Sequence, residues 1–375
     1  MTMLRKIASF LLEWSRFPAN LAKLWSFMND PRILPYTGDP ANTRSRALAW
    51  LDQIVWLIRH REVNEFYYLY RLDGRDRADL SSYIGYEEFR KLRDRINFNR
   101  HLAASRNYSI LLRDKFVFNK YMESIALPVP PTIALIERGS VRWAGECGPA
   151  PLSSLYDPHR PDFSSYCKYV YGECGEKIFR MIKQGDIVTL DDRRMTENEL
   201  ATALDGVFFV QREVRQHPEL DSFYPLTTNT LRLYTVMTRR GPELFYGIMR
   251  FGANGNRVDN WAIGGIIIKV DITTGELATE GYFKPEYGGV VTAHPATGRP
   301  FAGYRPPFFS ESAALAKETH QFFHGIRHIG WDIAITADGP VIIEGNDNWE
   351  ISVMQALDRR GWKQWMYENS SPEPR

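Results

Sequence analysis

Three oxygen-bearing side chains near the carboxyl end of the sequence could bind a metal ion. Asp332 lies in the apolar run GWDIAIT, and Glu344 and Asn346 end the run PVIIEGN. A turn around Asp338-Gly339 separates these runs, so we expect antiparallel strands that bring Asp332 and Glu344 together, with Asn346 on the same side. Two carboxylates and an amide oxygen suit Mg²⁺, whereas the two acids would repel each other without a cation. The alternative is a hairpin whose acids face water.

A lysine followed by a glycine-bearing loop forms a second candidate site, which could hold phosphate. In the segment SYCKYVYGECGEKIF, Lys168 lies on an expected strand, and Gly172 and Gly175 lie in the loop before the next strand. Glycines allow backbone N–H groups to approach an anion closely, and the lysine adds a positive charge. Many glycine hairpins that contain a lysine share this pattern, so the pattern alone does not identify a phosphate site.

An arginine near the start of another strand could stabilise a phosphoryl group. Arg232 lies in the alternating segment NTLRLYTV, so its side chain points away from its apolar neighbours and towards a cleft. There it could form two parallel hydrogen bonds with a transferred phosphoryl group or an acyl phosphate. Arg250 and Asn260 follow along the chain. The alternative is a strand arginine that faces solvent.

The elements that must position these residues divide the chain into a helical part and a mainly β part. Apolar residues recur at steps of three and four from about residue 42 to 105, which predicts helices there. Residues 162–190 alternate and contain glycines, which predicts two strands joined by a tight loop, and a Thr196–Glu199 capping box predicts a short helix. From Asn229 onward the pattern is mainly β. We therefore expect an α+β protein with a helical amino-terminal region.

Composition restricts the classes of function. The 375 residues carry a formal net charge of +2, which is too small to indicate a nucleic-acid partner. Three cysteines without an export signal fit a reducing cytoplasm, and no apolar run reaches the roughly 18 residues that a membrane span needs. We therefore expect a cytoplasmic protein without a nucleic-acid partner.

The first 28 residues form a basic amphipathic segment. Pro18 separates it into two short helical pieces, with arginines and lysines between the apolar positions. Such a segment can lie on an anionic membrane surface. We expect instead that it packs on its own domain, and we keep a peripheral membrane contact through residues 1–28 as the alternative.

The order of these features resembles that of the ATP-grasp superfamily over roughly residues 110–357. The resemblance is closest to the sugar-transfer associated ATP-grasp family, through the phrases NEFYYLYRLD, NTLRLYTV, VDNWAIGG and GWDIAITADGPVIIEGN. It implies an ATP-grasp fold, in which two α+β lobes hold ATP and Mg²⁺. The parts it implies are a helical region 1–105, a small lobe 106–220 with the phosphate loop and hinge strand, a large lobe 221–368 with the metal site, and a flexible tail 369–375.

The resemblance also implies roles for individual residues. The residues that match nucleotide contacts are Lys115, Lys168, Gly172, Gly175, Gln211, Arg212, Glu213 and Val214. Among them the two lysines would bind phosphates, the glycine loop would close over them, and Gln211, Arg212 and Val214 would meet the adenine. Either Glu213 or Glu219 would hold the ribose. The residues that match the acceptor side and the Mg²⁺ ligands are Arg232, Arg250 and Asn260, and Asp332, Glu344 and Asn346, respectively.

The activity that the resemblance implies is an ATP-dependent ligation. A small-molecule carboxylate would be activated as an acyl phosphate and joined to an amine or thiol acceptor. The sugar-transfer description suggests polysaccharide or amino-acid-conjugate biosynthesis. Two alternatives stay open: a phosphotransferase that acts on a sugar or another hydroxyl, and a nucleotide-binding scaffold without catalysis. A ligase releases ADP and phosphate, whereas a phosphotransferase releases no free phosphate.

Overall fold

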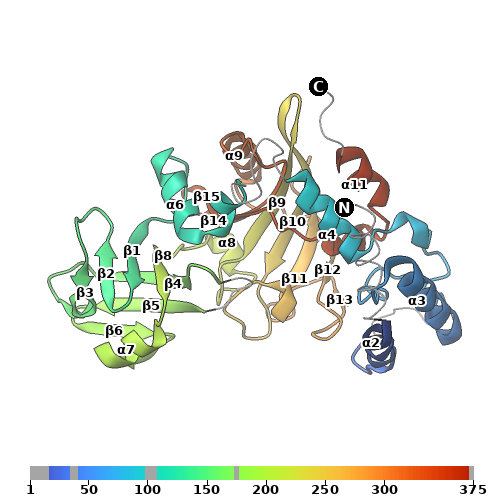
Figure 1. Cartoon of the computed structure of the whole chain (residues 1–375), viewed down its shortest axis with the longest axis horizontal. Helices are drawn as coiled ribbons and strands as arrows, with labels where there is room; N and C mark the ends of the chain where they lie inside the picture. The colour runs from blue at the N-terminus through green and yellow to red at the C-terminus, as the bar shows by residue number, and fades with distance from the viewer. Residues whose placement is uncertain (1–16, 34–40, 98–107, 173–176, 371–375) are drawn as a thin grey trace, which may run out of the picture.

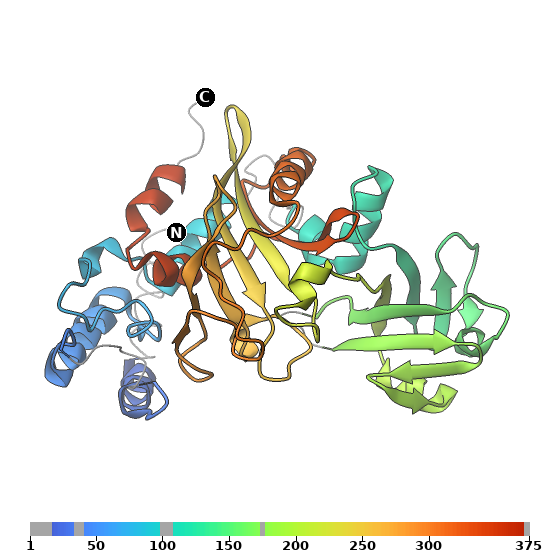
Figure 2. The same cartoon turned by 180° about the vertical axis from the view of Figure 1, so that it is seen from behind.

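The computed structural model describes residues 17–33, 41–97, 108–172 and 177–370. Three parts follow one another along its longest axis (Figures 1 and 2): a helical region at one end, a seven-stranded sheet in the middle and an eight-stranded sheet at the other end. Each part has its own cluster of buried apolar side chains. The cleft of interest lies where the two sheets meet.

The helical region contains fewer helices than the sequence pattern predicts. Its helices are α2 (Phe17–Asn29), α3 (Arg46–His60), η2 (Leu80–Ser82) and α4 (Tyr86–Ile96). The helical structure expected directly after residue 60 is absent, because Arg61 takes a left-handed conformation and its N–H caps α3 by bonding to the Leu57 carbonyl. The aromatic residues that follow pack as buried turns, with Tyr67 and Tyr70 in the core. The part of the prediction at residues 98–107 lies outside the described residues, as does the helical piece before Phe17.

The eight-stranded sheet is antiparallel throughout, in the order β3-β2-β1-β8-β4-β5-β6-β7. Its strands are β1 (Thr132–Glu137), β2 (Ser140–Trp143), β3 (Ala150–Pro151), β4 (Phe163–Tyr169), β5 (Ile178–Gln184), β6 (Ile187–Leu190), β7 (Arg193–Met195) and β8 (Val207–Arg212). The segment 162–190 therefore forms three strands rather than the expected two, because Gly185 turns the chain back into β6. Its helices are η4 (Leu152–Tyr156) and α7 (Glu197–Ala203), and α7 carries the predicted Thr196–Glu199 capping box.

The seven-stranded sheet is also antiparallel, in the order β13-β12-β11-β10-β9-β14-β15. Its strands are β9 (Thr230–Thr238), β10 (Gly241–Phe251), β11 (Ile266–Val270), β12 (Leu277–Tyr282), β13 (Val290–Val291), β14 (His328–Thr336) and β15 (Gly339–Asn346). The helices around it are α5 (Ile110–Arg113), α6 (Lys115–Ser124), α8 (Pro218–Asp221), η5 (Trp261–Ile263) and α9 (Phe309–Gln321). The hairpin predicted from the Asp338-Gly339 turn is present as β14 and β15.

The last two helices return to the helical region at the amino-terminal end. They are α10 (Ile351–Asp358) and α11 (Lys363–Ser370), and they lie beside α4 (Figure 1). Trp349, Met354 and Trp362 share one buried cluster with Tyr70 and Phe89. Among the described helices, none is long and apolar enough to cross a membrane. The predicted α+β class with a helical amino-terminal region is confirmed.

Candidate active site

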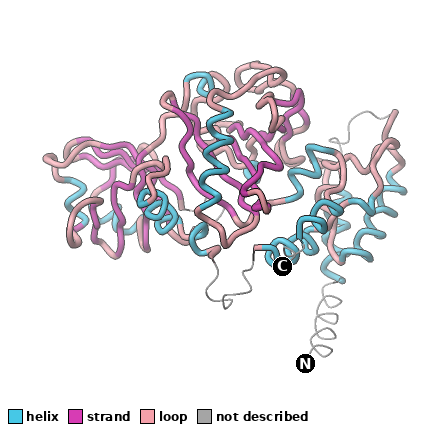
Figure 3. Tube along the Cα trace, turned by 90° about the horizontal axis from the view of Figure 1, so that it is seen from above, coloured by secondary structure: helices cyan, strands magenta, loops and turns pink. Residues whose placement is uncertain are grey.

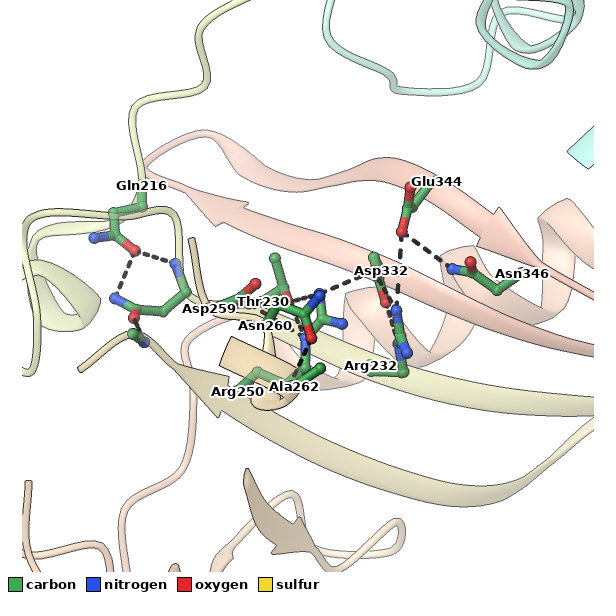
Figure 4. A network of polar contacts seen from close by, with 12 residues as sticks. Gln216, Thr230, Arg232, Arg250, Asp259, Asn260, Ala262, Asp332, Glu344 and Asn346 are labelled. Atoms are coloured by element: carbon green, nitrogen blue, oxygen red, sulfur yellow. Dashed lines mark hydrogen bonds and ion pairs between the residues drawn. The ribbon is translucent and has the colours of Figure 1, made fainter. Parts of the chain in front are cut away.

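Three adjacent strands place charged residues side by side across the seven-stranded sheet. In the strand registers, Asp332 on β14 faces Arg232 on β9 on one side and Glu344 on β15 on the other. Arg232 donates from Nε to one Asp332 oxygen and from Nη2 to the other, at 2.6 Å for the second bond (Figure 4). Arg250 on β10 donates from Nη2 to Asp332 Oδ2 at 2.9 Å. The expected closeness of Asp332 and Glu344 is therefore present, with two arginines added to it.

The two arginines keep the buried carboxylate of Asp332 ionised. Its side chain is 3% exposed. Burial alone would raise the pKa of Asp332, but the charges of Arg232 and Arg250 and the hydrogen bonds of Arg232 outweigh it and hold the pKa well below its usual range. A buried carboxylate is stable only when paired in this way. Asp332 thus fixes the positions of both guanidinium groups.

A second carboxylate, which the sequence analysis did not single out, orients Arg250 from the opposite side. Asp259 Oδ2 accepts from the Thr230 N–H at 3.0 Å and from the Thr230 hydroxyl at 2.5 Å, and Arg250 Nε approaches it at 3.3 Å. Arg250 also donates from Nη2 to the Thr230 oxygen at 2.7 Å. Asn260, the next residue, turns its side-chain oxygen to the Ala262 N–H and begins η5. The quoted phrase VDNWAIGG contained this signal, since Asp259 precedes Asn260 directly.

Glu344 and Asn346 form the more open end of the row. The Glu344 side chain is 37% exposed, and its Oε1 accepts from Asn346 Nδ2 at 3.3 Å. Partial burial and then the charge of Asp332 raise the pKa of Glu344. Arg232 Nη2 lies 3.9 Å from Glu344 Oε1, at the limit of an ion pair.

The donor set of this row can be tested against Mg²⁺, the ion that the sequence analysis expects. Glu344 and Asn346 offer oxygens of the kind that Mg²⁺ prefers, on one side of a strand end. Both oxygens of Asp332 are bonded to arginines, so Asp332 could join a metal only by exchanging one of these partners. The described residues contain no group of three or more His, Cys, Asp or Glu side chains placed to hold a metal ion. The residues therefore fit an ion that is bound by Glu344 and Asn346 and completed by other oxygens.

The residues expected to hold phosphate line one pocket between the two sheets. The pocket is bounded by Leu112, Lys115, Phe118, Lys168, Phe209, Gln211, Ile343 and Glu344. Lys168 Nζ donates to Gln211 Oε1 at 2.7 Å, and Lys115 Nζ donates to the Gly172 carbonyl. Burial lowers the pKa of Lys168 to about 8, against the opposing effect of Glu344. The pocket thus joins residues of the eight-stranded sheet to Glu344 of the seven-stranded sheet.

This pocket is narrow in the present conformation. Its free volume is about 10 Å³. Pockets for drug-sized ligands typically have about 300–1,000 Å³. The lysine side chains lie across it, with Lys115 reaching the loop carbonyl of Gly172. A nucleotide could therefore enter only if the two sheets move apart or these lysines release their present partners.

The hinge segment, which begins with the last two residues of β8, has side chains in different environments. Gln211 is buried and donates from Nε2 to Asn119 at 2.8 Å, while Arg212 is exposed. Glu213 is bound to Arg180 on β5 of the eight-stranded sheet, whose Nε and Nη2 each donate to it at 2.9 Å. Val214 is half-buried, and the alternative ribose acid, Glu219 on α8, is exposed. Gly175 lies outside the described residues.

The hinge is anchored to the start of β9 by one buried amide. Gln216 Oε1 accepts from the Asn229 N–H at 2.9 Å and from Asn229 Nδ2 at 3.0 Å (Figure 4). Its Nε2 donates to the Thr227 carbonyl at 2.8 Å. The strand that carries Arg232 and the segment that leaves Gln211 are therefore fastened together.

Comparison with known proteins places the candidate site within one family model. The model described as sugar-transfer associated ATP-grasp matches residues 93–367, which include every residue of the site named above. No curated protein matches the chain.

Solved structures give more distant matches. N5-carboxyaminoimidazole ribonucleotide synthetase from Thermotoga maritima matches with 11% identity and a TM-score of 0.34, over 64% of this chain and 43% of that one. The biotin carboxylase–β,γ-ATP complex from Campylobacter jejuni matches with 10% identity and a TM-score of 0.41, over 72% and 48%. D-alanyl-alanine synthetase A from Vibrio cholerae matches with 8% identity and a TM-score of 0.40, over 70% and 65%. The match thus spans less than two thirds of the length of each of these proteins.

Proposed function

Because this chain belongs to the sugar-transfer associated ATP-grasp family, we propose that it is an ATP- and Mg²⁺-dependent ligase that joins a carboxylate to an amine or thiol acceptor. One observation carries the proposal. Lys115, Lys168, Gln211 and Glu344, which come from four separate elements, line the same pocket between the two sheets. Two cations and a metal-binding type of carboxylate around one interlobe pocket suit the triphosphate of ATP.

Residues on the two sides of the pocket bind different parts of the complex of ATP with Mg²⁺. We assign the ATP phosphates to Lys115, at the start of α6, and to Lys168, on β4 of the eight-stranded sheet. Glu344 and Asn346 would hold Mg²⁺, which supplies positive charge to the phosphate oxygens during transfer. Asp332 acts here as the residue that positions Arg232 and Arg250, since both of its oxygens are bonded to them.

The reaction needs little covalent participation from the protein. A carboxylate oxygen of the substrate attacks the γ-phosphorus of ATP, the bond from that phosphorus to the β,γ-bridging oxygen breaks, and ADP leaves. The acceptor nitrogen or sulfur then attacks the acyl carbon, inorganic phosphate leaves, and the acceptor loses one proton. Arg232 and Arg250 stabilise the negative charge on the transferred group, and they do so at low cost because Asp332 and Asp259 already hold them in place.

The substrate class follows from the family description alone. A sugar acid or an amino acid that decorates a glycan is the substrate we propose, with the cytoplasm, where ATP is available, as the location.

The proposal can be tested by following ATP turnover. The purified protein is incubated with ATP, Mg²⁺ and pooled carboxylates and amines, and ADP and free phosphate are measured separately. We expect equal amounts of ADP and phosphate that depend on the added substrates. Glu344→Gln should abolish turnover, whereas Glu243→Gln, on the exposed end of the same sheet, should leave it unchanged.

Other outcomes would refute the ligase reaction. ADP without free phosphate would identify a phosphotransferase instead. Nucleotide binding without any ADP formation would favour the scaffold. Full activity of the Glu344→Gln protein would remove Glu344 from the metal site.

A further inference from the structure

The helix α3 presents its apolar residues to the outside of the molecule. Five aliphatic side chains on this helix are between 41% and 64% exposed, namely Leu48, Leu51, Ile54, Val55 and Ile58. The buried side of the same helix combines the apolar Ala49, Trp56 and Leu57 with Asp52 at 8% and Gln53 at 0% exposure. The outer side of a surface helix is normally polar. Apolar side chains on both sides indicate that the outer face of α3 is covered by something other than water.

The hydrogen bonds of the buried polar residues fix the rotation of α3 about its own axis. Asp52 accepts from Arg44 at 2.5 Å, from Arg77 at 2.6 Å and from the Tyr67 hydroxyl at 2.7 Å. Gln53 exchanges two hydrogen bonds with the backbone of Asn64. Turning the exposed side inward would separate Asp52 and Gln53 from these partners, which is unfavourable.

The neighbouring helix α2 extends the exposed apolar surface. Leu21 is 45% and Trp25 is 68% exposed, one helical turn apart, and the Trp25 ring lies 5.8 Å from that of Trp50 on α3. The adjacent side of α2 packs on the core through Leu24, Phe27 and Met28. We call the exposed side chains of both helices the α2–α3 face; its members are Leu21, Trp25, Leu48, Leu51, Ile54, Val55 and Ile58.

The position of the face leaves the candidate active site accessible. The α2 and α3 helices lie at the end of the molecule that is farthest from the eight-stranded sheet (Figures 1 and 3). The seven-stranded sheet stands between this end and the pocket that contains Lys168 (Figure 1). A partner on the face would therefore not block the entry of ATP.

The charges on the two helices select the kind of partner. Arg59 is exposed on α3. Lys23 and Arg46 are also exposed, but Lys23 pairs with Glu65 at 2.7 Å and Arg46 donates to the Met28 carbonyl at 2.9 Å. Within residues 17–29 and 46–60 the sole acidic residue is the buried and paired Asp52. We propose that the α2–α3 face lies on the surface of an anionic lipid membrane. Apolar side chains would enter the boundary of the acyl chains, Trp25 would lie at the interface, and Arg59 would meet lipid phosphates. A second copy of the chain would instead bring cations together, which is unfavourable.

This inference stands apart from the ligase reaction, because it needs neither ATP nor Mg²⁺. It also refines the alternative kept for residues 1–28. The membrane contact is now carried by α3 together with the second half of that segment, while residues 1–16 lie outside the described part of the chain.

The test is sedimentation of the full-length protein with lipid vesicles. One set of vesicles contains phosphatidylcholine with about 30% phosphatidylglycerol, and the other contains phosphatidylcholine alone. We expect binding to the anionic vesicles that weakens at high salt, since the electrostatic part is screened. The double variant Leu51→Glu with Ile58→Glu should bind at least about tenfold more weakly, because both replaced side chains lie on the face.

A matched control carries the same change of charge elsewhere. Leu226 and Phe322, which are 56% and 40% exposed on the seven-stranded part, are both replaced by Glu. This control should sediment like the natural sequence, and circular dichroism should show all three proteins folded. Absence of binding to anionic vesicles, or binding that survives the Leu51 and Ile58 changes, overturns the proposal. A dimer that these two changes dissociate would assign the face to a second copy.

Discussion

The replacement Asp332→Asn separates the structural role of this residue from the role of Glu344. Asp332 is 2% exposed and bonded to two arginines, so the amide would leave Arg232 and Arg250 facing a neutral partner in a buried place. Breaking a buried ion pair from one side costs about 3–5 kcal/mol. Glu344 is 37% exposed and lies 3.9 Å from Arg232, so Glu344→Gln should cost about 0–1 kcal/mol.

Urea denaturation, followed by tryptophan fluorescence, measures both effects in the same assay. We expect the midpoint of Asp332→Asn to fall clearly and that of Glu344→Gln to stay close to the natural value. Both variants should lose ATP turnover, the first because the arginines are no longer held and the second because it loses a metal ligand. Equal destabilisation by the two variants would refute the assignment of different roles. So would an Asp332→Asn protein of full stability.

Three further predictions concern other parts of the chain. Lys168→Met should weaken ATP binding at least about tenfold in calorimetry without unfolding the protein, because among the described residues its ammonium group donates one hydrogen bond, to Gln211. Unchanged affinity would remove Lys168 from the phosphate site. Burial raises the pKa of Glu62 from 4.5 to about 7, so its contribution to stability is complete below about pH 4.5 and is lost as the pH rises through 7. Relative to the Glu62→Gln protein, the natural protein should therefore lose melting temperature over that range. Parallel curves of melting temperature against pH for the two proteins would contradict this. Gly361→Ala should lower the melting temperature strongly, because an added Cβ would lie 2.0 Å from the Ser82 backbone. Gly298→Ala should cost only about 1–2 kcal/mol, because φ is +69° there and no atom lies within 4 Å of the added Cβ. Similar effects of the two changes would refute the steric argument.

The parts of the site that the sequence predicted are local in the chain. The β14–β15 hairpin follows from period-two alternation on both sides of the Asp338-Gly339 turn, and the pairing of Asp332 with Glu344 follows from that hairpin. The pairing of Asp332 with Arg232 and Arg250 does not follow in this way. These residues are 100 and 82 positions apart, and their contact depends on which strands become neighbours in the sheet. No local pattern encodes that order.

The helical region shows the opposite error, in which a strong local pattern was misleading. Apolar spacing continues past His60, but the helix stops there because Arg61 adopts a left-handed backbone and the following tyrosines are buried as turns. In α3 the helical spacing was correct, but apolar residues lie on both sides of the helix, and the buried side also holds Asp52, which is paired with Arg44 and Arg77. Periodicity predicts that one side of a helix is apolar, whereas the partners of the buried polar groups decide which side faces inward.

The shared core of the first and last helices affects how the chain is made. Gln355 on α10 accepts from the Ile84 N–H at 3.0 Å and donates to the Tyr70 hydroxyl at 3.2 Å, across 271 and 285 positions of sequence. A ribosome that has released the first hundred residues has therefore not yet supplied the side chains that complete their core. The amino-terminal helices must wait, with apolar surface exposed, until the final helices emerge.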